Sequence, residues 1–310
     1  MARKIIIDTD PGQDDAVAIL LALASPELEV LGITAVAGNV PLALTQRNAR
    51  VVVELAGSDV PVHAGAHAPL VRPLVTAEHV HGKTGLDGWD APEPSHPLAS
   101  EDAVGFIIKT VRAHPGEVTL CPLGPLTNVA QALRRAPGLA EAIPQIVLMG
   151  GAYFEVGNIT PAAEFNIYVD PEAAAEVFSS GIDIVVLPLD VTHKALTTRA
   201  RNEAIAALGN RTGEAVAGWT GFFERFDKEK YGSEGAPLHD PCVIAYLLRP
   251  GLFTGRHVNV EIETGSELTR GMTVADWWGV TDRAPNATFM GDVDAEGFYA
   301  LLTERLQTLP

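Results

Sequence analysis

Continuous apolar runs alternate with segments of helical periodicity along the first 190 residues of the chain. The runs at residues 4–8 and 31–37 do not alternate between apolar and polar side chains, which is typical of strands buried on both faces of a sheet. Between them, residues 14–24 repeat apolar side chains with helical spacing until Ser25 and Pro26 end the pattern. The same criteria predict strands at 4–8, 31–37, 60–63, 118–123, 146–149 and 184–189, and helices at 14–24, 41–55, 100–113, 126–135 and 170–179. We expect Ser100 to cap the helix at 100–113 and Asp170 to cap the helix at 170–179.

This alternation of strands and helices predicts an α/β fold. Right-handed crossovers make the strands parallel and place helices on both faces of the sheet. We therefore expect an open, mainly parallel, Rossmann-like sheet in a single domain over residues 1–310, since no linker divides the chain. Beyond residue 198 the chain is mostly helical, with an antiparallel pair at 257–263 and 272–278 and a final helix at 295–306.

Polar residues and glycines follow several of the predicted strands. Ligands of such sheets bind outside the carboxyl ends of the strands, so these residues are the first candidates for a site. The segment 64–98 loses all periodicity and is rich in Pro, Gly and His, and a loop of this length in a compact domain is usually functional. The candidates directly after strands are Asp10, Asn39, Leu123-Gly124, Gly150-Gly151 and Asp190.

Composition excludes several classes of protein. The chain of 310 residues is 47% hydrophobic and carries a formal net charge of -17, with no basic stripe, so we expect no nucleic-acid partner. Its apolar segments are too short to span a membrane, and no signal peptide is recognisable, which favours a cytoplasmic protein. Cys121 and Cys242 have no metal-type spacing, and we expect them to be buried thiols without a disulfide.

Four carboxylates fall within residues 8–15, which read DTDPGQDD, where the first strand passes into the first helix. Asp14 and Asp15 are favoured at a helix N-terminus by its partial positive charge, whatever the function. Asp8 and Asp10 precede the helix and need another explanation. Because like charges this close repel one another and lose hydration in a closed pocket, we expect a cation among them, and a hard divalent ion suits oxygen ligands.

Two other acidic motifs fit this stretch less well. In an EF-hand loop a ligand would stand at the position of Gly12, and no acid closes the loop at its twelfth position. The start Asp8-Thr9-Asp10 also resembles the aspartyl-phosphate phosphatases, with Asp8 as the nucleophile. In that motif, D-x-D-x-T/V, Gly12 replaces a hydroxyl or β-branched residue. A metal-dependent phosphatase stays as an alternative with a weaker motif.

Residues 8–16, DTDPGQDDA, resemble the N-terminal signature of the calcium-dependent nucleoside hydrolases of the inosine-uridine or pyrimidine ribonucleoside type. Further stretches match that family in order, so the similarity extends past residue 240. The resemblance implies the nucleoside hydrolase fold and hydrolysis of the N-glycosidic bond of ribonucleosides to ribose and free base, for nucleoside salvage. The further stretches are Gly38-Asn39, residues 81–86 (HGKTGL), Gly157-Asn158 with residues 164–166 (EFN), and residues 239–241 (HDP).

The resemblance also implies a metal site and a general base. It makes Ca²⁺ the cofactor, a calcium-bound water the nucleophile, and Asp10 the general base that takes a proton from this water. Asp14 would accept a hydrogen bond from a ribose hydroxyl. This agrees with the chemistry, since glycoside hydrolysis needs an activated water on one face of the sugar and help for the leaving group on the other. The implied calcium ligands are Asp10, Asp15, Asp240 and the backbone carbonyl of Leu123.

By the same resemblance, His239 protonates the departing base, a role that suits an imidazole with a pKa near neutrality. The preferred base stays open, because Asp227 stands where pyrimidine-preferring relatives tend to have an amide. The remaining histidines, His63, His67, His79, His96, His114, His193 and His257, have no predicted role. The implied residues for ribose and base are Asn39, His81, Asn158, Glu164, Phe165, Asn166 and Tyr231.

Two further expectations concern partners and rivals. The small-molecule partner is a ribonucleoside, and the resemblance implies a homo-oligomer, either a dimer or a tetramer. A non-catalytic nucleoside-binding protein that has kept the pocket is the second alternative. The complete set Asp10, Asp14, Asp15 and Asp240 speaks against it, because a pure binding protein does not need a base that activates water.

Overall fold

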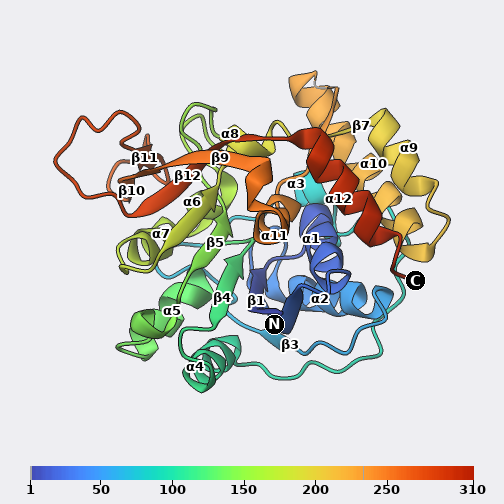
Figure 1. Cartoon of the computed structure of the whole chain (residues 1–310), viewed down its shortest axis with the longest axis horizontal. Helices are drawn as coiled ribbons and strands as arrows, with labels where there is room; N and C mark the ends of the chain where they lie inside the picture. Colours follow the sequence, from blue (N-terminus) through green and yellow to red (C-terminus); the bar gives the residue numbers. More distant parts are fainter. Residues whose placement is uncertain (1, 233) are drawn as a thin grey trace.

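The computed structural model describes residues 2–232 and 234–310, and for residues 226–231 it describes the helical backbone without the side chains. These residues form an eight-stranded sheet in the order β3-β2-β1-β4-β5-β6-β12-β9 (Figure 1). The strands from β3 to β12 run parallel and β9 is antiparallel. The strands of this sheet are β1 (Arg3–Thr9), β2 (Leu28–Ala35), β3 (Val62–Ala64), β4 (Val118–Pro122), β5 (Ile146–Met149), β6 (Ile184–Leu187), β9 (Phe253–Val258) and β12 (Ala287–Val293).

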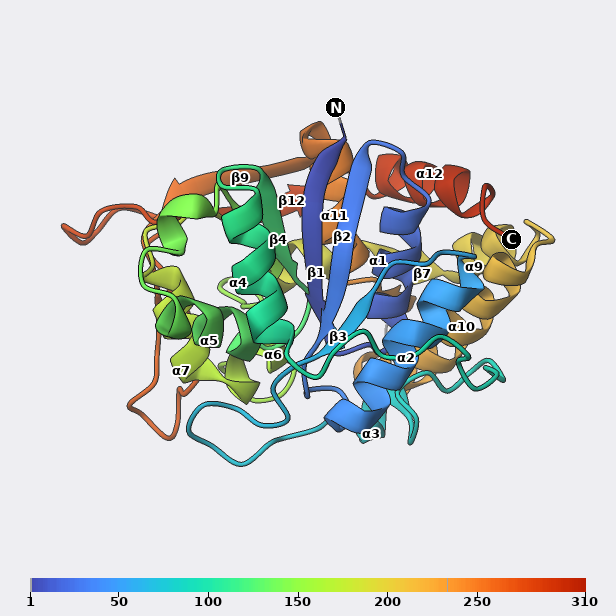
Figure 2. The same cartoon turned by 90° about the horizontal axis from the view of Figure 1, so that it is seen from below.

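Helices cover both faces of the sheet. On one face α1 (Gln13–Leu23) packs against α2, α10, α11 and α12, and on the other α5 packs against α4 and α7 (Figure 2). Each face has its own buried apolar cluster, since Ile5 and Ile7 of β1 belong to one and Ile6 to the other. The remaining helices are α2 (Leu42–Leu55), α3 (Glu78–His81), α4 (Ala103–Ala113), α5 (Thr127–Arg135), α6 (Phe165–Val169), α7 (Pro171–Phe178), α8 (Leu189–Thr192), α9 (Arg199–Ala206), α10 (Arg211–Tyr231), α11 (Pro241–Leu248) and α12 (Ala295–Leu306).

The strand order confirms the predicted α/β class and shows where a ligand is expected. From β1 the chain adds β2 and β3 on one side and β4, β5 and β6 on the other, so the winding reverses between β1 and β4. Asp8 of β1 is in register with Pro122 of β4, and both strands end within two residues of this pair. The carboxyl ends of β1 and β4 therefore form the switch point at which open α/β sheets bind ligands.

Several element predictions need correction. The strands β9 and β12 escaped detection because β9 is an edge strand with only its end residues buried, and β12 contains Gly291 and a shift of register. The short helices α3 and α6 were also missed. Asp102, not Ser100, caps α4, where its carboxylate accepts a hydrogen bond from the amide of Gly105 at 2.9 Å.

Other predictions on the C-terminal side are confirmed. The antiparallel pair exists as β10 (Val260–Ile262) and β11 (Thr273–Ala275), shorter than expected because residues 257–258 belong to β9. The final helix has the predicted bounds, with Asp294 as its N-cap. A second small sheet joins β7 (Leu196–Thr198) to β8 (Gly235–Pro237). No helix among the described residues is both long enough and apolar enough to cross a membrane.

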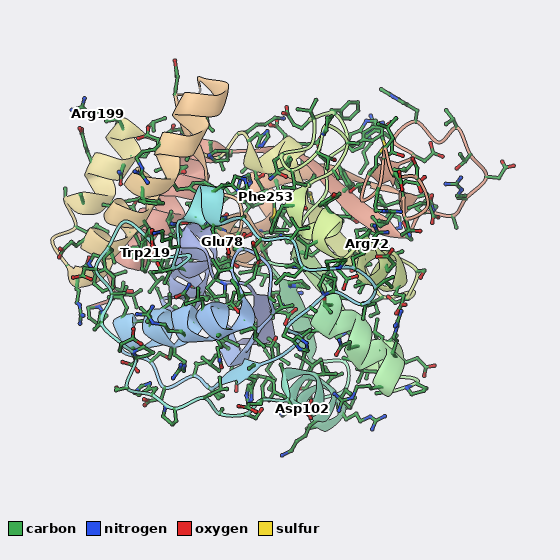
Figure 3. The ribbon with its side chains drawn as sticks, turned by 180° about the vertical axis from the view of Figure 1, so that it is seen from behind. Arg72, Glu78, Asp102, Arg199, Trp219 and Phe253 are labelled. Atoms are coloured by element: carbon green, nitrogen blue, oxygen red, sulfur yellow. The ribbon has the colours of Figure 1, made fainter. Side chains whose placement is uncertain are left out.

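The long segment 64–98 contains α3 and is held at several points. Arg72, labelled in Figure 3, forms a bidentate ion pair with Glu172 of α7, with a closest distance of 2.6 Å. The amide of Leu70 donates to the carboxylate of Asp170 at 2.9 Å. Later in the segment, the side-chain amide of Gln13 in α1 donates hydrogen bonds to the backbone carbonyls of His81 and Asp87. These bonds hold α3 beside the ends of β1 and β2.

Candidate functional site

Buried carboxylates gather at the carboxyl end of β1. Asp10 follows the strand, Asp14 and Asp15 stand in the first turn of α1, and Asp240 precedes α11. Oxygen atoms of Asp14, Asp15 and Asp240 lie within 4.8 Å of one another, and these side chains are at most 5% exposed. A cluster of carboxylate oxygens at this spacing could hold a divalent metal ion.

Asp10 and Asp15 are held in place by Asn39, which follows β2. The amide N–H of Asn39 donates to Oδ2 of Asp10 at 2.7 Å, and its side-chain amide donates to Oδ2 of Asp15 at 3.2 Å. Thr9 Oγ1 and the amide of Gly12 also donate to Asp15. Among the described residues, the buried Oδ1 of Asp10 has no hydrogen-bond partner. An unpaired, buried carboxylate oxygen beside the other acids is what a cation ligand requires.

Two glycines make room for the Asp10 carboxylate. A Cβ at Gly38, after β2, would overlap Oδ2 of Asp10, and a Cβ at Gly124, after β4, would overlap Oδ1. The backbone therefore closes around the carboxylate from both neighbouring strands. The carbonyl oxygen of Leu123, the residue before Gly124, accepts a hydrogen bond from Nδ2 of Asn166 at 2.6 Å.

Burial and mutual repulsion raise the pKa values of these acids. For Asp14, loss of hydration and the neighbouring Asp15 raise the pKa to about 8. For Asp10, burial first and then Asp15 raise the pKa well above its usual value, and for Asp240 burial and Asp14 do the same. A bound cation would offset both causes, because it replaces hydration and attracts the charged forms. The residues present therefore fit a metal ion.

Asp8 stands apart from this cluster. Its Oδ1 accepts hydrogen bonds from Thr34 Oγ1 at 2.5 Å and from Asn128 Nδ2 at 2.8 Å, both within the sheet and its covering helix. It does not line the pocket described below. Because these hydrogen bonds hold the Asp8 carboxylate toward β2 and α5, its position disfavours the phosphatase alternative and agrees with a supporting role for Asp8.

A pocket opens above the acids. Its floor is Asp14 and Asp240, and its walls come from α3, from the loop before α6 and from α10. A lining that combines carboxylates and amides with aromatic rings suits a small polar molecule that carries a flat ring. The predicted Asp10 and Asp15 do not line this pocket, and Asp10 also lies outside the group of carboxylate oxygens within 4.8 Å of one another. The lining residues that the sequence predicted are Asp14, Asn39, His81, Leu123, Asn158, Glu164, Phe165, Asn166, His239 and Asp240.

Three polar predictions meet on one wall of the pocket. Glu164 caps α6, with its two oxygens accepting from the amides of Gly151, Asn166 and Ile167. Its burial nevertheless raises the pKa to about 7. Asn158 Oδ1 accepts a hydrogen bond from the amide of Phe165 at 2.9 Å, and Asn158 also lines the pocket.

His239 lies across the pocket, and its environment corrects one premise of the sequence prediction. Its Nδ1 is 2.7 Å from Thr192 Oγ1, at the end of α8. Burial, followed by the proximity of His193, lowers the pKa of His239 well below its usual value, so the free imidazole is neutral near pH 7. The near-neutral pKa inferred from residue type was wrong because the sequence does not show the burial.

Several pocket residues were not predicted. His79 and His193, for which no role was expected, line the pocket together with Ile159 and Phe223. The ring of Phe223 stacks on His81 with centroids 5.5 Å apart. Only its position in the predicted base-contacting helix could have signalled Phe223, whereas the histidines lie on segments without a motif. The predicted base contact Tyr231 ends α10, and its side chain lies outside the described residues.

Comparisons with known proteins agree with this geometry. A family model described as inosine-uridine preferring nucleoside hydrolase matches residues 5–300. An uncharacterized protein of Schizosaccharomyces pombe is 55% identical over 99% of this chain and 100% of its own length. The pyrimidine-specific ribonucleoside hydrolase RihA of Salmonella agona is 52% identical over 99% of both chains.

Solved structures show the same architecture. A plant nucleoside hydrolase, PpNRh1, superposes with a TM-score of 0.92 at 35% identity and covers 99% of both chains. A purine-preferring ribonucleoside hydrolase from Gardnerella vaginalis has a TM-score of 0.92 at 32% identity and covers 98% of both chains.

Proposed function

Because the chain belongs to the inosine-uridine preferring nucleoside hydrolase family, its reaction is hydrolysis of the N-glycosidic bond of ribonucleosides, and we propose that Asp10 is the general base of this reaction. The proposal rests on the environment of the buried Asp10 carboxylate. One of its oxygens accepts a hydrogen bond from Asn39, and the other has no hydrogen-bond partner among the described residues.

The metal is proposed to be Ca²⁺, held by Asp10, Asp15, Asp240 and the carbonyl oxygen of Leu123. When bound, calcium supplies Lewis-acid activation of water and a fixed anchor for vicinal hydroxyls. Asp14 shares the spacing of the cluster and also lines the pocket, so it is proposed to accept a hydrogen bond from a ribose hydroxyl. Leu123 can contribute although Asn166 already donates to it, because a carbonyl oxygen has two lone pairs.

The ribose and the base are proposed to bind at opposite ends of the pocket. Asn158, Glu164 and Asn166 present polar groups beside the acids, which suits ribose hydroxyls. The stacked rings of His81 and Phe223 also line the pocket, and an aromatic ring suits contact with a base. Asn39, Phe165 and Tyr231 complete the proposed substrate contacts.

His239 is proposed to assist the leaving base. With Nδ1 engaged by Thr192, the nitrogen that remains for the pocket is Nε2. The imidazole is neutral in the free protein, so in this proposal an Nε2–H group donates a hydrogen bond to the base as it gains negative charge during bond cleavage.

Pyrimidine ribonucleosides, uridine and cytidine, are the proposed substrates. Support comes from relatives at 52% identity over 99% of the chain that are named pyrimidine-specific. The chain is proposed to act as a single domain and as a homo-oligomer, with the dimer or tetramer that the family resemblance implies.

A nucleoside panel tests the proposed function. The purified protein is incubated with uridine, cytidine, inosine and adenosine, with and without a calcium chelator, and reducing sugar and free base are measured. We expect ribose and base in equal amounts from the pyrimidine nucleosides, loss of turnover in chelator and recovery with added calcium. Binding without turnover would indicate the non-catalytic alternative, and phosphate release from monoesters would indicate the phosphatase.

A further inference from the structure

Gln13 lies within the acidic stretch at residues 8–15 and has no role in the chemistry described so far. It is 1% exposed and stands at the start of α1, facing the segment that carries His81. Its side-chain Nε2 donates to two backbone carbonyls, that of His81 at 2.9 Å and that of Asp87 at 3.1 Å. Its Oε1 lies 2.6 Å from Nδ1 of His81.

These contacts determine which way round the amide lies. If the amide were reversed, its oxygen would face two carbonyl oxygens, and none of the three atoms could donate a hydrogen. The NH₂ group must therefore face the carbonyls, and Oε1 must face the imidazole. Since a carbonyl oxygen only accepts, Nδ1 of His81 must carry the hydrogen.

The position of the imidazole itself is fixed from other sides. Phe223 stacks on it at an interplanar angle of 27°. On the side of the turn, a Cβ at residue 12 would come within 2.5 Å of Nδ1, so only glycine leaves room. Burial, with a smaller effect of His79, lowers the pKa of His81 to about 3, which keeps the ring neutral near pH 7.

We propose that Gln13 is a positioning residue that holds His81 in the Nδ1–H form, so that His81 offers Nε2 to the pocket as a hydrogen-bond acceptor. This proposal rests on the proposed function for the identity of the ligand. The complementary group on a pyrimidine nucleoside is an N–H or O–H donor. The vicinal 2′- and 3′-hydroxyls are the ones proposed above to bind at the calcium site and Asp14, so the donor is either the base N3–H of uridine or the 5′-hydroxyl.

The tautomer can be read without any substrate. Nitrogen-15 NMR of the imidazoles distinguishes a protonated ring nitrogen from one with a free lone pair, and His81→Phe identifies the signals of His81. We expect a protonated Nδ1 and an unprotonated Nε2 in the wild-type protein. A protonated Nε2 in the wild-type protein overturns the proposal, and this readout stands even if the protein hydrolyses no nucleoside.

Gln13→Met, which conserves volume but removes the amide, tests the consequence for binding. We expect a mixture of tautomers and a rise of about tenfold in KM for uridine with kcat little changed, since one uniformly made hydrogen bond is weakened. Gln307→Met, at an exposed position after α12, is the matched control and should match wild type. In a His81→Phe background, Gln13→Met should add no further loss, because Gln13 acts through His81. Fully additive losses overturn the proposal.

Two analogues identify the donor. For 3-methyluridine, which lacks N3–H, or for 5′-deoxyuridine, which lacks the 5′-hydroxyl, the penalty of Gln13→Met should disappear when the missing group is the one that donates to His81. A penalty that persists at full size with both analogues overturns the acceptor role of His81. Melting curves of each variant show that the fold is retained.

Discussion

The main-chain amide of Asn39 donates a hydrogen bond to Oδ2 of the Asp10 carboxylate at 2.7 Å, and the other oxygen lies on the side of Gly124. That other oxygen, Oδ1, is buried and lacks a partner among the described residues. The chain following β2 thus orients the group that follows β1. This arrangement depends on backbone at Gly38 and Gly124 that lies against the carboxylate without a side chain between them.

Gly38→Ala should therefore displace the Asp10 carboxylate. A methyl group at this position would overlap Oδ2, and a shift of the carboxylate by even 1 Å typically costs about a hundredfold in rate. We expect kcat for uridine to fall by about that factor and calcium affinity to fall with it. Gly251→Ala is the matched control, because nothing lies within 4 Å of its added methyl group, and it should keep full activity. Equal behaviour of the two variants would show that the close approach has no consequence.

His239→Ala should reduce the rate of hydrolysis by an amount that depends on the leaving group of the substrate. For uridine we expect kcat to fall by about 10²–10⁴, the usual contribution of a positioned proton donor. For a nitrophenyl riboside, whose leaving group needs no proton, the loss should be less than about tenfold. Initial rates on both substrates measure the ratio, and equal losses would rule out assistance to the leaving group. Thr192→Val, which removes the partner of Nδ1, should reproduce the same selectivity at smaller size.

Stability without metal should fall as the pH rises. The folded-state pKa values of Asp8, at about 7, and Asp14, at about 8, lie above the ordinary value of 3.8, so the folded protein holds protons that the unfolded chain releases. Their contribution to the free energy of unfolding is complete below about pH 4 and is lost as the pH rises through the folded-state values. In chelator, we expect the melting temperature to decrease from about pH 5 to about pH 8.

Two comparisons isolate the cause of that decrease. Asp14→Asn should show a shallower fall, whereas Asp282→Asn, at an exposed carboxylate far along the chain, should follow the wild-type slope. Saturating calcium should reduce the slope, because the ion stabilises the charged carboxylates in the folded state. If the melting temperature of Asp14→Asn falls with pH as steeply as that of the wild-type protein, burial of this carboxyl does not contribute to the pH dependence of stability.

The parts of the fold that depend on local pattern could be predicted from the sequence. Continuous apolar runs indicate the strands that are buried on both faces. Capping residues such as Asp170 indicate where helices begin. The strand β9 could not be found in this way, because an edge strand with an exposed middle has no apolar run. Ser100 was preferred to Asp102 as a cap because residue type alone does not separate neighbouring candidates.

The residues of the site also fall into those that a local motif predicts and those that only the packing of the fold brings together. The acids at residues 8–15 and the residues 239–241 belong to motifs, and the structure brings Asp14, Asp15 and Asp240 together. The placement of His193 and Phe223 in the pocket and the low pKa of His239 follow from packing between distant segments, which no local pattern records. The bond between Gln13 and His81 likewise joins residues 68 positions apart.

The central claim is that one carboxylate serves both the metal and the attacking water. Its most direct test is the variant Asp10→Ala, with calcium binding measured by calorimetry and uridine hydrolysis measured at saturating calcium. We expect a large loss of calcium affinity and no detectable turnover, while Asp59→Ala retains both. Near-normal turnover by Asp10→Ala would contradict the claim.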